Sequence, residues 1–127
     1  MKHVIALVDD LMFLSRVREA ARGADVAVRP ARGTREVVEA ARTGACLVIV
    51  DLDSSRLPWA EAVRALRAEP SGAGLPVVGF LSHLNAQAAR EAREAGCTEV
   101  MARSAFVKEL PGLLAGAAGG TEAPETT

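Results

Sequence analysis

Short apolar runs alternate with longer segments of helical periodicity along most of the chain. Three of these runs are continuously apolar rather than alternating, as parallel strands buried on both faces usually are. The second run is the shortest and the weakest. We predict strands at His3–Val8, Val26–Val28, Cys46–Val50, Pro76–Leu81 and Glu99–Ala102.

Between the strands, apolar residues recur every three or four positions, which is the spacing of one helix face. The predicted helices contain such stripes at 14–21, 37–41, 59–66, 88–95 and 106–114. Gly23, Gly44 and Gly96 predict the ends of three helices, because glycine readily adopts the left-handed conformation that closes a helix. Pro111 lies inside the last stripe, so that helix either starts late or bends.

Five successive strand–helix units predict an α/β fold: a doubly wound parallel sheet with helices on both faces and right-handed crossovers. In such folds, ligands bind at the carboxyl ends of the strands. We expect one domain over residues 1–116. Residues 117–127 are small or polar and rich in Gly and Thr, so we expect a disordered tail there.

Composition and charge narrow the class of protein. Half of the 127 residues are hydrophobic and 24% are charged, as in a globular domain. The formal net charge of −1 provides no broad basic field for nucleic acid or an anionic membrane. No apolar run approaches the roughly 20 residues that span a bilayer, and the first run ends in two aspartates, unlike a secretory signal. We expect a cytoplasmic protein that binds neither nucleic acid nor membrane.

Aspartates follow two of the predicted strands. Asp9 and Asp10 come after the first strand, and Asp51 and Asp53 after the third. If these strands are neighbours, the carboxylates converge and must share protons or bind a cation. Oxygen ligands of this kind suit Mg²⁺, and one aspartate could then attack a phosphoryl group. Alternatively, the aspartates face water and cap helices, as Asp10 could do. Both interpretations stay open.

Four segments resemble, in order, the receiver domains of two-component response regulators: VIALVDD, VIVDLD, LPVVGFLS and EAGCTEVMARS. The resemblance extends over residues 4–114. It implies the flavodoxin-like receiver fold, (βα)5 with strand order 2-1-3-4-5, and a place in bacterial phosphorelay signalling. It further implies that Asp51 is the phosphoacceptor, and that a Mg²⁺ ion is held by Asp9, Asp10, Asp51 and the carbonyl of Asp53.

The positions that relay phosphorylation depart from the family. Receivers carry Ser or Thr at the end of the fourth strand, where an ungapped count puts Leu81, with Ser82 one residue later. Leucine cannot donate a hydrogen bond to phosphate. Arg103 stands at the switch-lysine position, and its planar fork is not equivalent to an ammonium group. Val100 replaces the usual aromatic residue. The pattern therefore predicts a degenerate receiver, or pseudo-receiver.

Two roles remain open for Arg103. Its guanidinium could lie over the pocket and pair with Asp51, which would offset the acidic cluster without a metal. Alternatively, it could point to solvent in a weak surface ion pair.

Three functions follow from these observations. The leading hypothesis is a non-enzymatic interaction module. The resemblance to receivers implies that it binds a histidine kinase or a downstream target through its fourth helix, fifth strand and fifth helix, with a homodimer as a further possibility. The second is a working Mg²⁺-dependent phosphoacceptor at Asp51. The third is a flavodoxin-like domain that binds a small ligand or catalyses a reaction. Against the third, His83 is the only further acid–base group near the strand ends.

Overall fold

Five parallel strands form one sheet in the computed structural model, which describes residues 2–83 and 85–119. The strands are β1 (His3–Leu7), β2 (Ala27–Pro30), β3 (Ala45–Asp51), β4 (Val77–Leu81) and β5 (Glu99–Ala102). The helices are α1 (Leu11–Ala24), α2 (Thr34–Ala41), α3 (Trp59–Ala68), α4 (Ala86–Ala95) and α5 (Arg103–Gly119). The spatial order β2-β1-β3-β4-β5 confirms the predicted topology.

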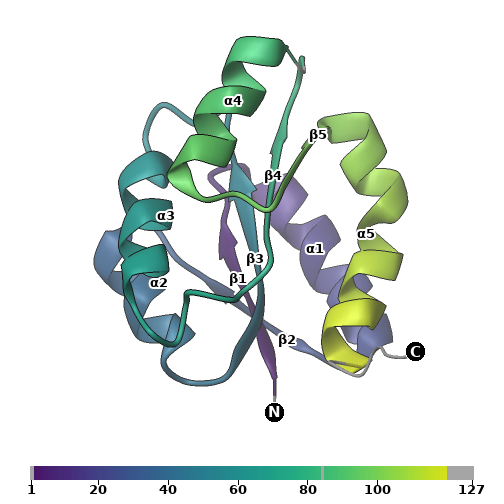
Figure 1. Ribbon diagram of the computed structural model, residues 1–127. Helices are drawn as coiled ribbons and strands as arrows, with labels where there is room; N and C mark the ends of the chain where they lie inside the picture. Colours follow the sequence, from purple (N-terminus) through teal and green to yellow (C-terminus); the bar gives the residue numbers. More distant parts are fainter. Residues whose placement is uncertain (1, 84, 120–127) are drawn as a thin grey trace, which may run out of the picture.

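The sheet separates two apolar layers, as Figure 1 shows: α1 and α5 cover one face, and α2, α3 and α4 cover the other. β1 is buried along its whole length and β3 along most of it, because each lies between two neighbouring strands and two layers of helices. This explains why their sequences are continuously apolar. All three phenylalanines of the sequence, Phe13, Phe80 and Phe106, stack together in the layer beneath α1 and α5.

The three glycines predicted the ends of their helices with different accuracy. Gly96 closes α4 with a φ of 128°, as predicted. The prediction for Gly23 was wrong, because α1 continues to Ala24 and Asp25 takes the left-handed conformation with a φ of 60°. Aspartate tolerates that conformation better than most residues. Gly44 adopts a φ of 100° in the turn between α2 and β3, three residues beyond the end of α2.

Helix α5 runs without interruption from Arg103 to Gly119, although Pro111 lies inside it. A late start is therefore excluded. Leu110 and Leu114, on either side of the proline, are buried against the sheet. Residues 117–119, which we expected in a tail, belong to the helix because Ala117 and its neighbour pack on the core; residues 120–127 lie outside the described residues. No helix within the described residues, α5 included, could cross a bilayer.

Candidate functional site

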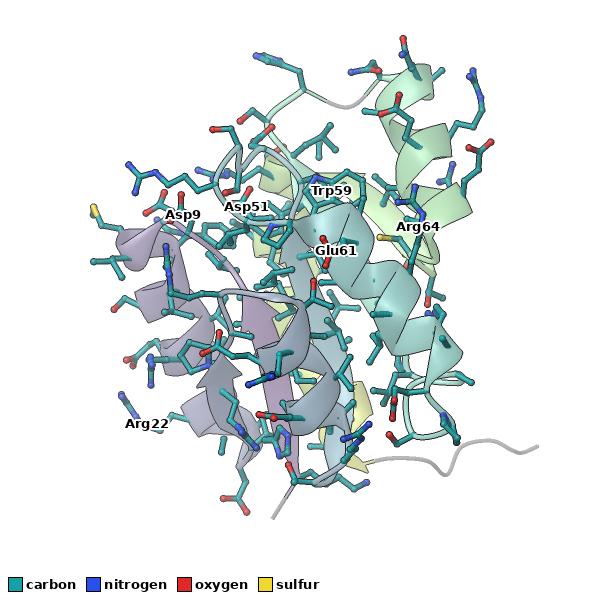
Figure 2. All side chains as sticks on the ribbon, turned by 90° about the vertical axis from the view of Figure 1, so that its left-hand side faces the viewer. Asp9, Arg22, Asp51, Trp59, Glu61 and Arg64 are labelled. Carbon is teal, nitrogen blue, oxygen red and sulfur yellow. The ribbon has the colours of Figure 1, made fainter. Side chains whose placement is uncertain are left out.

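The four aspartates singled out from the sequence line one pocket at the carboxyl ends of β1 and β3. The pocket has a volume of about 330 Å³, and its lining residues are Asp9, Asp10, Asp51, Asp53, Ser54, Ser55 and Arg56. In Figure 2, the labelled Asp9, Asp51 and Trp59 lie at the same end of the sheet. The topology causes this convergence, since β1 and β3 are parallel neighbours and both end here.

Asp51 is the last residue of β3 and the only buried carboxylate among the described residues, with 4% of its surface exposed. The backbone N–H of Asp53 donates to its Oδ1 at 3.0 Å. Burial raises the pKa of the Asp51 carboxyl above its ordinary value, because the charged form loses its water. The Asp53 carboxylate adds to this rise in pKa, whereas the Asp53 backbone N–H and Arg103 oppose it.

Asp10 caps α1. Its Oδ1 accepts hydrogen bonds from the backbone N–H groups of Met12 at 2.9 Å and Phe13 at 3.2 Å. Its Oδ2 lies 3.8 Å from Nη1 of Arg103. Asp10 therefore combines the two roles that the sequence left open, since one oxygen caps the helix while the side chain also lines the acidic pocket.

Asp9 is held by two arginines that the sequence analysis missed. Nη2 of Arg32 lies 3.3 Å from Oδ1 of Asp9, and Nε of Arg56 lies 3.7 Å from Oδ2. The Ser54 hydroxyl donates to the same Oδ2 at 3.5 Å. Both arginines follow the carboxyl end of a strand that neighbours β1. A search of all strand ends for basic as well as acidic residues would have placed both arginines at this edge of the sheet, but not in contact with Asp9.

Ser82 follows β4 and contacts Asp53. Its backbone N–H and its hydroxyl both donate to Oδ2 of Asp53, at 2.8 and 2.7 Å. Leu81, which the ungapped count placed at the hydroxyl position, is buried in the apolar layer beneath α2, α3 and α4. In this arrangement the Ser82 hydroxyl is engaged by Asp53 and makes no hydrogen bond with Asp51 among the described residues.

Arg103 is the first residue of α5, and its guanidinium lies against aromatic rings. The guanidinium carbon is 4.9 Å from the ring centre of Phe13 and 5.6 Å from that of Phe80. Such cation–π contacts stabilise by about 0.5–2 kcal/mol each. Among the described residues, its one carboxylate contact is the 3.8 Å approach to Asp10. Arg103 therefore makes no ion pair with Asp51, and its contacts with the rings show that it does not simply point into solvent.

The predicted Mg²⁺ ligands form an open set. Within residues 2–83 and 85–119, no three His, Cys, Asp or Glu side chains are arranged to enclose a metal ion together. Mg²⁺ often binds through only one or two carboxylates and keeps several waters. Asp10 and Asp51, which both line the pocket, fit that description. The residues therefore suit a weak site in which Mg²⁺ keeps several waters and competes with arginines for the carboxylates.

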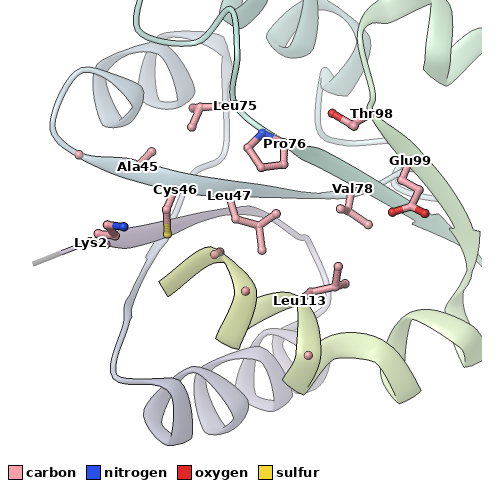
Figure 3. A pocket seen from close by; sticks show the side chains of 14 residues that line it. Lys2, Ala45, Cys46, Leu47, Leu75, Pro76, Val78, Thr98, Glu99 and Leu113 are labelled. Carbon is pink, nitrogen blue, oxygen red and sulfur yellow. The ribbon is translucent and has the colours of Figure 1, made fainter. Parts of the chain in front are cut away.

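A second pocket, of about 650 Å³, lies at the opposite end of the sheet, between β3, β4 and α5 (Figure 3). Its lining is mostly apolar, and its only titratable side chains are those of Lys2, Cys46 and Glu99. Burial raises the pKa of the Cys46 thiol, which makes it a poor nucleophile. We therefore take the acidic pocket, which lies where doubly wound folds bind ligands, as the candidate site.

Comparisons with known proteins identify the fold. No protein-family model and no curated protein matches the sequence. Solved structures do match. A response regulator from Hahella chejuensis has a TM-score of 0.81 at 14% identity, covering 98% of this chain and 100% of its own. The receiver domain of a Pseudomonas aeruginosa sensor histidine kinase, with magnesium in its active-site cleft, has a TM-score of 0.76 at 17% identity, covering 93% and 98%. The chemotaxis protein CheY4 of Vibrio cholerae has a TM-score of 0.76 at 19% identity, covering 90% and 96%. The chain thus has the receiver fold.

Proposed function

We propose that this chain is a degenerate receiver of bacterial two-component signalling, a cytoplasmic and non-enzymatic module that works through protein–protein contacts without a phosphorylation-driven switch. The observation that carries the proposal is the charge balance of the acidic pocket. Arg32 and Arg56 contact Asp9, and Arg103 contacts Asp10. Two of the four aspartates that line the pocket are thus in contact with three guanidinium groups.

The arginines offset the charge that a divalent metal would otherwise offset. A guanidinium group stays protonated at every physiological pH, so its compensation is permanent. The Arg32 and Arg56 side chains are 57% and 76% exposed, and ion pairs of this kind contribute under about 1 kcal/mol. Arg103 matters most, because the rings beneath it hold its charge near Asp10 and Asp51.

The parts that would relay a phosphoryl group are also altered. Ser82 bonds to Asp53, and Leu81 is in the core. Val100 is buried in the layer beneath α4 and has no ring that could move inward. A modification can shift a conformational equilibrium only through contacts that differ between the two states. A phosphoryl group on Asp51 therefore has no evident element to move.

We further propose that the face formed by α4, β5 and α5 binds a signalling partner, either a histidine kinase or a downstream target. The outer side of α4 carries exposed charges of both signs, from Arg90, Glu91, Arg93 and Glu94. Its inner side consists of alanines packed on the sheet. The exposed charges suit a polar, reversible interface rather than a permanent one.

The test is a titration with Mg²⁺ and beryllofluoride, a mimic of the phosphoryl group. Trp59, the only tryptophan, begins α3 next to the acidic pocket and serves as a fluorescence reporter. Amide NMR shifts provide a second readout over the whole sheet. We expect no saturable change that depends on Asp51. Saturable shifts on α4, β5 and α5 that disappear in Asp51→Ala would refute the proposal.

A second candidate function is phosphoacceptance, in which an oxygen of the Asp51 carboxylate attacks the phosphorus of a phosphodonor, the bond from phosphorus to the donor breaks, and the donor leaves without its phosphoryl group. The burial of Asp51 among the three other aspartates favours it. Asp10, Asp51 and the carbonyl of Asp53 would hold Mg²⁺, which supplies positive charge for the transferred group. Intact-mass spectrometry after incubation with acetyl phosphate and Mg²⁺ tests this function. A phosphorylated product in the wild type, absent from Asp51→Ala, would establish it.

A further inference from the structure

A basic pocket lies on the far side of Arg103 from the acidic one, between α1 and α5. Its volume is about 680 Å³, within the range of small-molecule sites. Its lining residues are Phe13, Arg16, Ser82, Arg103, Ser104, Val107 and Lys108. Three cations and two hydroxyls thus surround an apolar floor, and no carboxylate lines the pocket.

Arg103 reaches this pocket with its hydrogen-bonding capacity unused. Although its side chain is only 36% exposed, none of its N–H groups makes a hydrogen bond with the described residues. Its Nε is fully buried and has no partner. A buried donor that is left unpaired is destabilising, because it loses its hydrogen bonds to water. The contacts with Phe13 and Phe80 offset part of this penalty and hold the planar group in place.

The other two cations of the pocket, unlike Arg103, have no carboxylate partner among the described residues. Arg16 and Lys108 form no ion pair with any residue in the described part of the chain, although the arginines of the acidic pocket do. Both lie beside Arg103, so three like charges share one pocket. α5 begins at Arg103, which adds the partial positive charge of a 17-residue helix. The charged side chains that line this pocket are therefore all positive, and Asp10 beside Arg103 is the one carboxylate paired with them among the described residues.

We propose that the α1–α5 pocket binds a small organic anion, a molecule that carries a phosphate or carboxylate group on an apolar body. The anionic group meets Arg103, Arg16 and Lys108, with the Ser104 hydroxyl as a further donor. The apolar body lies on Val107 and Phe13. Binding does not use Asp51, so the proposal is independent of the function proposed above.

The experiment follows amide NMR shifts during titration with three probes, in buffer freed of divalent metal by a chelating resin so that no metal enters the acidic pocket. Phenyl phosphate and benzoate share a ring and differ in the anionic group, and inorganic phosphate lacks the ring. We expect saturable shifts at the amides of Phe13, Ser104 and Val107 with at least one ring-bearing probe, and weaker binding of inorganic phosphate.

Two charge-matched double variants complete the design. Arg16→Gln with Lys108→Gln should weaken binding of the ring-bearing probe about tenfold or more, which corresponds to about 1.4 kcal/mol. Arg90→Gln with Arg93→Gln removes the same charge from the exposed side of α4 and should leave affinity within about twofold. Absence of saturation with all three probes, or equal losses in the two variants, would overturn the proposal.

Discussion

Replacing Asp51 with asparagine should make the protein more stable at neutral pH. Asp51 is almost fully buried, and three further aspartates line its pocket. Asparagine has nearly the same shape, and its Oδ1 can still accept the hydrogen bond from the Asp53 N–H. The substitution therefore removes a buried charge and keeps the packing.

The sign of the effect follows from the pKa of Asp51, which burial raises above its ordinary value of 3.8. Between the two pKa values the folded protein holds a proton that the unfolded chain has lost, so the stability of the wild type falls as pH rises through that interval. Each pKa unit corresponds to about 1.4 kcal/mol. Relief of one destabilising group commonly adds about 0.5–2 kcal/mol, or roughly 2–8 °C in Tm for a chain of this length.

Urea unfolding followed by circular dichroism measures this difference at several pH values. The advantage of Asp51→Asn should be full at pH 7.5 and shrink as the pH approaches the ordinary Asp value of 3.8. Glu94→Gln, the same change of charge at an exposed position of α4, should have almost no effect. The reasoning fails if Asp51→Asn is no more stable than wild type at pH 7.5, or if its advantage grows in acid.

Two further predictions concern the turn before β5, the strand that leads directly into Arg103. Arg67→Met should lower the free energy of unfolding by about 2–4 kcal/mol, because Arg67 donates to the Gly96 carbonyl at 2.9 Å and to Thr98 Oγ1 at 3.1 Å. Arg64→Met, on the exposed side of the same helix, is the control, and an equal loss there would contradict the prediction. Gly96→Ala should lower the free energy of unfolding by about 1–3 kcal/mol in the same urea assay. The reason is that φ of Gly96 is 128° and the new Cβ would lie 2.7 Å from Cγ of Arg67. An unchanged midpoint of unfolding would count against this prediction.

Local patterns could predict the fold because burial and strand order are coupled. Continuous apolar runs such as 4–8 and 47–50 are typical of strands covered by helices on both faces of a sheet, and the structure buries both runs. Helix ends were harder to predict. The residue in the left-handed conformation after α1 is Asp25 rather than Gly23. The end of this helix depends on where Val26 enters the core as much as on the position of a glycine.

The acidic pocket was predictable for a topological reason, and its cationic surroundings were not. Parallel strands bring their carboxyl ends to one edge, so Asp9 and Asp51 had to approach each other once β1 and β3 were neighbours. The approach of Arg32 and Arg56 to Asp9 depends on loop conformations, and the hydrophobic periodicity of the sequence does not predict these. The position of Arg103 depends on rings from two separate elements, Phe13 of α1 and Phe80 of β4.

Aromatic packing decides how Arg103 can act. A guanidinium held only by Asp10 would follow that carboxylate, but their 3.8 Å separation is too long for a hydrogen bond. The phenyl rings of Phe13 and Phe80 determine its plane instead. Its N–H donors therefore stay between two pockets of opposite charge, whichever anion is present. An anion in the α1–α5 pocket would compete with Asp10 and Asp51 for the same positive charge, so occupancy of one pocket should alter the electrostatics of the other.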